Sequence, residues 1–90
     1  MYQLVFSNRF KKNYKLVQKR GYDMGLLFNV FTQLKNTGNV YIKYKPHKLS
    51  GEFEGCWECH IKPDWLLIWS IDEQIKTITL HYTGTHSDLF

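Results

Sequence analysis

The segment that most constrains the fold of this 90-residue chain is an almost unbroken apolar run from Trp65 to Ile71. Lys62-Pro63-Asp64 precedes the run and Asp72-Glu73-Gln74 follows it, and both tripeptides have the composition of turns. An apolar run of this length between two turns predicts a strand that is covered on both faces. The sequence therefore predicts a sheet with this strand at its centre.

Two neighbouring segments are predicted to be strands that pair with the central one. Cys56 to Ile61 alternates between two faces, and the last strand is predicted from Ile75 to Thr83, with Ile78, Leu80 and Tyr82 on one face. The turns between these strands are short, so we expect antiparallel hairpins.

The first part of the chain predicts a strand followed by two helices. Tyr2 to Phe6 alternates weakly and is predicted to be a short strand. Apolar residues then recur at helical spacing after a cap at Ser7 or Asn8, and a second helix is predicted from a cap at Asp23 to Gly38. The expected order of elements is β-α-α-β-β-β, an α+β fold whose antiparallel sheet has the helical hairpin packed on one face.

Length and composition exclude several classes of protein. No apolar run approaches the ~20 residues that a membrane helix needs, and the N-terminus lacks the pattern of a signal peptide. Two cysteines are too few for a disulfide scaffold. We therefore expect a single cytoplasmic domain over residues 1–90 with no membrane partner.

Charge is distributed unevenly along the chain. Residues 1–50 contain ten basic residues against one acidic residue, whereas residues 51–90 contain two against seven. The resulting balance of +9 and −5 indicates a surface that faces a polyanion. Four of the basic residues lie on the exposed side of the first predicted helix: Lys11, Lys12, Lys15 and Lys19. The alternative explanation for these lysines is that they only make this side of the helix soluble in water.

The two cysteines carry the most conspicuous motif. Cys56-Trp57-Glu58-Cys59-His60 matches the C-x-x-C-H motif to which haem is covalently attached. However, the two thiols are predicted on opposite faces of a strand, and no export signal precedes them. A zinc site needs about four ligands, and His60, His81 and His86 would supply them only by coincidence. We therefore interpret both cysteines as small apolar strand residues and expect neither a metal nor another cofactor.

The histidines are better candidates for chemistry. A hairpin closed at Lys62-Pro63-Asp64 places His60 and Asp64 at one end of the sheet, and the last strand returns His86 to that end. Histidine is suited to proton transfer near neutral pH. RNA needs no protein nucleophile because its 2′-OH attacks the adjacent phosphate, so a basic domain with these groups fits RNA cleavage.

Three stretches resemble the YafQ branch of the RelE/ParE superfamily of bacterial toxins: His47-Lys48-Leu49-Ser50-Gly51, the segment from Glu58 to Ile68, and Thr83 to Phe90. Length and element order fit this family as well. The resemblance implies a ribosome-dependent mRNA endonuclease of a type II toxin–antitoxin pair, which enters the ribosomal A site and cuts mRNA without a metal.

The resemblance also implies roles for individual residues. The catalytic set would be His47, His60, Asp64 and His86. His86 is favoured as the acid and His60 or Asp64 as the base, with Trp65 and Phe90 as aromatic support against the substrate.

The chain departs from the family in its arginines. Many members carry Arg at the positions of Trp57 and Tyr82, and the only arginines here are Arg9 and Arg20. We therefore expect lysines to stabilise the charge of the scissile phosphate in place of arginines, namely Lys43, Lys45, Lys48 and Lys62.

The expected partners are a neutralising antitoxin, in a heterotetramer, together with mRNA and ribosomal RNA. Lys11, Lys12, Lys15 and Lys19 would contact ribosomal RNA or an acidic antitoxin segment. The alternatives are a ParE-like poison of DNA gyrase and a non-catalytic RNA-binding module. ParE-like relatives generally lack the His–Asp–His set, so its presence favours RNA cleavage.

Overall fold

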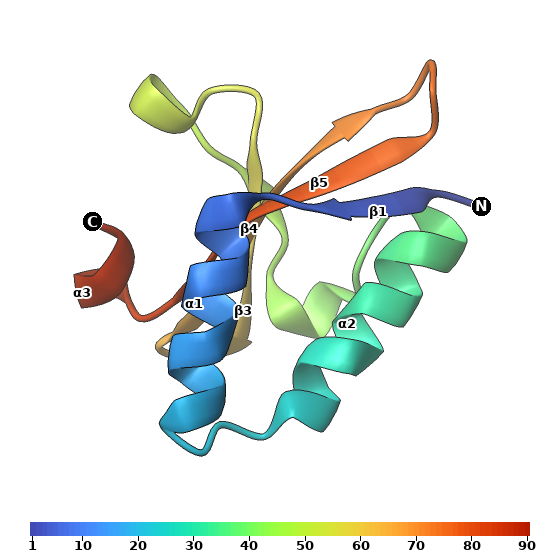
Figure 1. Ribbon diagram of the computed structural model, residues 1–90. Helices are drawn as coiled ribbons and strands as arrows, with labels where there is room; N and C mark the ends of the chain where they lie inside the picture. The colour runs from blue at the N-terminus through green and yellow to red at the C-terminus, as the bar shows by residue number, and fades with distance from the viewer.

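The computed structural model describes residues 1–90 as one sheet with helices on both sides (Figure 1). The elements follow one another as β1 (Gln3–Phe6), α1 (Asn8–Lys19), α2 (Met24–Thr37), η1 (Ile42–Tyr44), β2 (His47–Lys48), η2 (Gly51–Phe53), β3 (Trp57–Lys62), β4 (Trp65–Asp72), β5 (Thr77–Gly84) and α3 (His86–Leu89), where η marks a turn of 3₁₀ helix. None of the helices combines the length and the hydropathy needed to cross a lipid bilayer. The predicted α+β class and the order of the main elements are confirmed.

The sheet has the strand order β1-β5-β4-β3-β2 and is mixed. The pairs β2–β3, β3–β4 and β4–β5 are antiparallel as expected, whereas β1 runs parallel to β5. A tight turn forces antiparallel pairing, but β1 and β5 are separated by both helices and three strands, so no turn restricts the direction in which they pair. The purely antiparallel sheet expected from the sequence is therefore wrong at this one pair.

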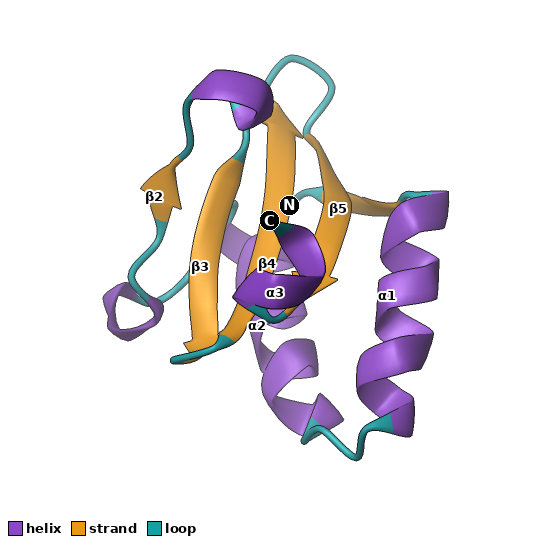
Figure 2. Cartoon of the chain, turned by 90° about the vertical axis from the view of Figure 1, so that its left-hand side faces the viewer, coloured by secondary structure: helices purple, strands orange, loops and turns teal.

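The central position predicted for the apolar run is confirmed. β4 is the third of five strands, and every residue from Trp65 to Trp69 is buried. Trp65, Leu67 and Trp69 face α1 and α2 and belong to the main core, whereas Leu66 and Ile68 are buried on the opposite face. Figure 2 shows α3 on that opposite side, in front of the sheet.

Both long helices begin at the predicted caps, and α2 ends at the predicted Gly38. The Ser7 side chain accepts the Phe10 N–H at the start of α1, and the Asp23 side chain accepts the Gly25 N–H at the start of α2. Gly38 ends α2 in the left-handed conformation, with φ of 75°, which glycine adopts without a steric penalty. Each helix buries one face against the sheet.

The register of β5 differs from the prediction. Leu80 pairs with Trp69 and Tyr82 pairs with Ile68, so His81 is an extra residue in a β-bulge. A bulge reverses the alternation beyond it, which turns Tyr82 to the face opposite Leu80. The shared face predicted for Ile78, Leu80 and Tyr82 is therefore wrong, and Tyr82 lies on the side of α3, where it contacts Phe53 edge-on at 5.7 Å.

Candidate active site

The β3–β4 hairpin and the end of β5 bring three predicted catalytic residues together. His60 pairs with Leu66 across the hairpin, Asp64 lies in its turn, and Gly84 at the end of β5 also pairs with Leu66. The ring centroids of His60 and His86 are 6.0 Å apart. The predicted convergence of His60, Asp64 and His86 at one end of the sheet is confirmed.

The contact between Asp64 and His86 uses two hydrogen bonds to one carboxylate oxygen. The His86 backbone N–H donates to Asp64 Oδ1 at 3.0 Å, and ring Nδ1 lies 2.9 Å from the same oxygen. These bonds, the backbone one first, lower the pKa of Asp64. The ionised carboxylate can only accept, so ring Nδ1 carries the proton and the Nε2 of the neutral ring is free for chemistry.

A second group of three residues lies beside the first. His47 on β2 pairs directly with Glu58 on β3, and Glu58 shares its strand face with His60. Ring Nε2 lies 3.1 Å from Glu58 Oε1 for His47 and 3.8 Å for His60. Glu58 is only 5% exposed, although it is a carboxylate. Glu58 is a site residue that was not predicted from the sequence, although its place on the same alternating face as His60 is a signal that could identify it.

Backbone carbonyl groups fix the orientation of both rings in this second group. Nδ1 of His47 lies 2.9 Å from the Lys45 carbonyl oxygen, and Nδ1 of His60 lies 3.4 Å from that of Pro63. A carbonyl oxygen can only accept a hydrogen bond, so Nδ1 of each ring is the donor. The Nε2 of His47, 3.1 Å from Glu58 Oε1, can then donate to this carboxylate when the ring carries both protons.

The three imidazoles form a row with His60 in the middle. The centroid of its ring is 6.0 Å from that of His47, in a stacked arrangement, and 6.0 Å from that of His86. Phe90 extends the row beyond His86, with a centroid distance of 6.3 Å, and packs edge-on against Phe53 at 5.2 Å. Phe90 remains 61% exposed as a residue, so it is open to a ligand.

A bidentate ion pair fastens α3, and thus His86, to the body of the protein. Arg20 at the end of α1 donates to both oxygens of Asp88, at 2.6 and 3.0 Å. Asp88 also accepts the Thr85 N–H, while the Thr85 side chain accepts the Asp88 N–H and completes a capping box. The hydrogen bonds from Arg20, with those of Thr85, hold the pKa of Asp88 far below its usual range.

Three of the four predicted phosphate-binding lysines share a cleft with His60. Lys43, Lys45 and Lys62 line a cleft of about 570 Å³ together with His60. The fourth, Lys48, lies elsewhere, because it follows His47 on β2 and neighbouring strand residues face opposite ways. Its ammonium group lies 5.7 Å from the centre of the Trp57 ring, so the expectation that Lys48 joins this site is corrected.

Trp65 does not reach the substrate side either. Its ring is 2% exposed and faces the helices, where Nε1 donates to Thr83 Oγ1 at 2.9 Å and Tyr22 contacts it edge-on at 4.8 Å. Trp65 therefore supports the sheet from within the core, which corrects its predicted place against the substrate.

The two arginines have different surroundings. Arg20 is occupied by Asp88, whereas the Arg9 guanidinium lies over the Tyr82 ring, 5.7 Å from its centre. The β-bulge that turns Tyr82 toward α3 thereby brings one guanidinium toward the face of the sheet that carries the histidines.

Comparison with known proteins agrees with this arrangement. The chain matches a family model described as bacterial toxin of type II toxin–antitoxin system, YafQ, over residues 2–90. It is 38% identical over 88 residues to the mRNA interferase toxin YafQ of Escherichia coli strain K12, which covers 97% of this chain and 94% of the relative.

Solved structures give the same result. The toxin in the E. coli DinJ–YafQ complex is 36% identical with a TM-score of 0.88, covering 100% of this chain and 99% of that one. A metal-bound toxin from Helicobacter pylori is 39% identical with a TM-score of 0.91, and the match covers 100% of both chains. The fold and the relatives thus define a toxin of a type II toxin–antitoxin system. Within that class, the chain belongs to the YafQ family.

Proposed function

We propose that this protein is an endoribonuclease that cuts mRNA on the ribosome by acid–base chemistry. The observation that carries the proposal is the row of three imidazoles at one end of the sheet, each with an acceptor beside Nδ1. The YafQ of E. coli, named an mRNA interferase toxin, supports the same activity. In this reaction the 2′-OH attacks the neighbouring phosphate, and the 5′-oxygen of the next nucleotide leaves.

His86 is the proposed general acid. Its Nδ1 is held by Asp64, so a proton on Nε2 points away from the protein and can pass to the leaving 5′-oxygen. The Asp64 carboxylate holds the ring in one orientation through this contact. Asp64 is occupied by two donors from His86, which favours a positioning role over that of a base.

His60 is the proposed general base. It lies between the other two rings, and its Nε2 in the neutral form can accept the proton of the 2′-OH. Glu58 is buried below His47 and His60 and orients both rings rather than reaching the RNA itself.

Charge that develops on the phosphate is stabilised by cations around the row. Lys43, Lys45 and Lys62 line the cleft beside His60 and act as point charges, and His47 contributes when it is protonated. The exposed Phe90 ring is proposed to stack on an mRNA base next to the cleavage site, a contact worth about 1–3 kcal/mol.

The exposed lysines of α1 are proposed to hold the protein in the ribosomal A site. Lys11, Lys12, Lys15 and Lys19 are all exposed, whereas Phe10 and Val17 of the same helix are buried. This exposed side of α1 is rich in cations, although Leu16 is exposed among them. It fits ribosomal RNA, whose phosphates supply the opposite charge.

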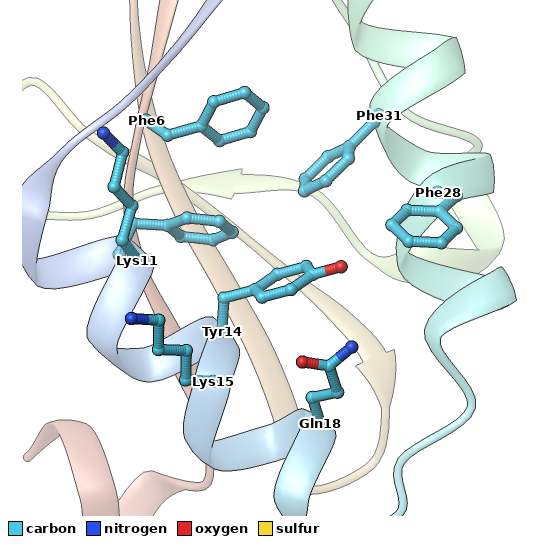
Figure 3. Close-up of a pocket in the computed structure, with 8 residues that line it drawn as sticks. Phe6, Lys11, Tyr14, Lys15, Gln18, Phe28 and Phe31 are labelled. Carbon is cyan, nitrogen blue, oxygen red and sulfur yellow. The ribbon is translucent and has the colours of Figure 1, made fainter.

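The neutralising antitoxin is proposed to occupy the groove between α1 and α2. Figure 3 shows aromatic rings from β1, α1 and α2 around this groove, which has a volume of about 550 Å³. Phe6, Tyr14, Phe28 and Phe31 form much of its wall, with lysines of α1 on its rim. An apolar groove with a basic rim fits an amphipathic segment that carries acidic residues, and E. coli YafQ has been solved in complex with DinJ. We place this groove in the interface of the proposed heterotetramer.

The function is tested by cell-free translation with mapped mRNA ends, with and without ribosomes. The proposal expects in-frame cuts on translated message only, which leave a 5′-hydroxyl and a 2′,3′-cyclic or 3′-phosphate. Equal cutting of naked RNA would overturn the ribosome dependence, and no cutting with inhibition of DNA gyrase would replace the nuclease by a ParE-like function.

A further inference from the structure

We propose that Arg9 binds a backbone phosphate of the mRNA on the 3′ side of the cleavage site, and that the Tyr82 ring holds its guanidinium in place for this contact. Phe53 and Phe90 continue the same surface from Tyr82 to His86. The inference rests on the proposed nuclease function, because it takes the direction of the mRNA from the roles of the histidines.

The pairing of the strands places Tyr82 on the face of the sheet that carries the histidines. Residues that pair directly across antiparallel strands have their side chains on the same face. Glu58 pairs with His47 on one side and with Ile68 on the other, and Ile68 in turn has Tyr82 as its partner. His47 and Tyr82 therefore lie in one row across four strands. Neighbouring strands are about 4.8 Å apart, so this row is roughly 14 Å long.

Contacts with β5 fix the start of α1 beside Tyr82. β1 has four residues and pairs only with the first half of β5, so the second half has no strand on that side. Ser7 Oγ, at the cap of α1, donates to a β5 carbonyl oxygen at 3.3 Å. Asn13 Oδ1, further along the helix, accepts the Thr83 N–H at 3.2 Å. Arg9 lies between these two contacts, and its side chain reaches the Tyr82 ring from the edge of the sheet.

The Arg9 guanidinium is held by the ring and remains free to bind an anion. Its central carbon lies 5.7 Å from the centre of the Tyr82 ring, within the range of a cation–π contact. A guanidinium can stack on an aromatic ring while its N–H groups bind two oxygens of one phosphate. Arg9 is exposed, and none of the ion pairs in the structure includes it.

The position of Arg9 in α1 adds to the positive potential. The helix begins at Asn8, and its first turn contains no acidic residue. The N-terminus of a helix carries a partial positive charge, so a basic residue there does not stabilise the helix. The stability of α1 therefore does not explain Arg9, whereas the helix terminus and the guanidinium together attract a phosphate.

A continuous aromatic surface connects Arg9 to the proposed general acid. Tyr82 contacts Phe53 edge-on with ring centroids 5.7 Å apart, and Phe53 contacts Phe90 edge-on at 5.2 Å. Phe90 in turn lies 6.3 Å from the His86 ring. Figure 2 shows α3, which begins with His86, in front of the sheet. Bases stack on aromatic rings without regard to sequence, so this surface suits single-stranded mRNA.

The proposed roles of the histidines give the direction of the message. His60 acts on the 2′-OH of the nucleotide before the cut, and His86 acts on the 5′-oxygen of the nucleotide after it. His60 is on β3, whereas Tyr82 is on β5 and Arg9 comes from α1 at the edge of β5. Arg9 thus lies on the side of the nucleotide that leaves. We assign to it the first phosphate on the 3′ side of the scissile one.

The test places one methylphosphonate, which has no charge, at that phosphate in an otherwise ordinary message. Wild-type cleavage on the ribosome should slow about tenfold, and Arg9→Gln should slow cleavage of the ordinary message by a similar factor. If the two groups are partners, the variant acting on the modified message should also be only about tenfold slow. Effects that multiply to about a hundredfold would overturn the contact.

Three further variants act as controls. Lys35→Gln removes one charge from α2 and should keep the full sensitivity of the rate to the methylphosphonate. Tyr82→Phe retains a ring and should keep this sensitivity as well, whereas Tyr82→Leu should lose most of it. If Tyr82→Leu is as sensitive as wild type, the ring does not hold Arg9. Thermal melting is measured for each variant, and Arg9→Gln at its exposed position decides if Tyr82→Leu unfolds.

A second arm of the test separates mRNA from ribosomal RNA as the source of the phosphate. Binding of Arg9→Gln is measured on empty ribosomes and on ribosomes that carry a 2′-O-methyl message, which cannot be cut. We expect a loss of affinity only when the message is present. Equal losses on both would assign Arg9 to ribosomal RNA and overturn the proposal. This arm needs no cleavage, so it also decides the case in which the wild type cuts no mRNA and the proposed function itself fails.

Discussion

At the scale of single residues, the atom beside Nδ1 decides what each histidine can do. His47 and His60 have a backbone carbonyl there, whereas His86 has the carboxylate of Asp64. A carbonyl is a neutral acceptor, whereas Asp64 presents a carboxylate whose pKa is lowered by its hydrogen bonds from His86. This difference supports His60 as the base and His86 as the acid in one row of similar side chains.

The pairing of Asp64 with His86 gives a prediction about pH. The pKa of Asp64 is lowered from its ordinary value of 3.8 by the hydrogen bonds of His86. A carboxyl with a lowered pKa contributes its stabilisation fully above the unfolded value, and the contribution is lost as the pH falls through the folded value. We therefore expect the NMR signal of the His86 backbone amide, which donates to Asp64, to keep its position as the pH falls through the ordinary carboxyl range and to shift only below that range. In Asp64→Asn the tautomers of the His86 ring should be mixed at neutral pH and cleavage about 100-fold slower; an unchanged tautomer would contradict the positioning role.

At the scale of elements, the short helix α3 depends on contacts far away in the sequence. α3 has four residues, too few to be stable alone, and Arg20 holds it through Asp88 across 68 positions of the chain. The helix carries both His86 and Phe90 toward the other histidines. The position of the proposed acid is therefore determined by α1 as much as by β5.

Arg20→Gln should consequently separate α3 from the body without unfolding the protein. An exposed ion pair is generally worth about 0.2–1 kcal/mol, so the melting temperature should change little. Displacing a catalytic group by about 1 Å can cost up to about 100-fold in rate, so we expect a 10- to 100-fold loss of cleavage. Hydrogen exchange of the α3 amides measures the separation directly, and Lys35→Gln removes an equal charge from α2 as control. Wild-type cleavage by Arg20→Gln would show that the ion pair does not position His86.

The strands also show which parts of the fold could be predicted from the sequence. β4 could be predicted because a short apolar run between two turns fits few structures other than a buried strand. The hairpin that β4 forms with β3 then placed His60 and Asp64 together. The bulge at His81 could not, because one extra residue in a strand leaves the local pattern almost unchanged and is decided by packing across the sheet. Tyr82 was therefore assigned to the wrong face.

The errors at individual site residues have similar causes. Lys48 follows His47 and Trp65 follows Asp64 in the sequence, so both were expected at the site. Neighbouring residues of a strand face opposite sides of the sheet, however, and both side chains lie on the other side. Glu58 was missed because its importance comes from burial beneath two histidines, one of which reaches it from β2, in a segment with no predicted strand. The pair of Arg20 and Asp88 depends on tertiary structure alone.

At the scale of the whole molecule, the two halves of the chain divide binding from chemistry. The basic half supplies α1, α2 and the groove between them, whereas the acidic half supplies β3, β4, β5 and α3 with most of the histidines. The α1 lysines lie both on the proposed ribosome-binding face and on the rim of the groove. One surface thus serves both partners, so we expect antitoxin and ribosome to exclude each other.

The ribosome-binding face is tested by its salt dependence. Replacing Lys11, Lys12 and Lys15 with Glu should weaken ribosome binding. It should also reduce the slope of log K (the binding constant) against log salt concentration by about 0.7–0.9 for each lost phosphate contact. A triple replacement at Lys35, Lys48 and Lys76 changes the net charge equally and should leave the slope closer to wild type. If both variants have the same slope, the α1 lysines are an ordinary solvated face.

The groove is tested by a change that spares the lysines. Phe28 is 48% exposed in the groove wall, so Phe28→Asp should weaken binding of the cognate antitoxin about tenfold or more while the isolated toxin keeps its cleavage rate. Ile42→Asp replaces an exposed apolar residue outside the groove and serves as control. Affinity for the antitoxin is measured by calorimetry. If the two variants bind the antitoxin equally well, the antitoxin does not occupy this groove.

The most direct test of the central claim, that His86 donates a proton to the leaving 5′-oxygen, replaces that oxygen with sulfur. A 5′-phosphorothiolate leaves without protonation and no longer needs the acid, whereas the base is still required. On ordinary mRNA, His86→Ala and His60→Ala should each reduce single-turnover cleavage on the ribosome by about 10²–10⁴-fold. On the thiolate message, His86→Ala should return to near the wild-type rate while His60→Ala stays slow. A His86→Ala variant that remains equally impaired on both messages would contradict the account.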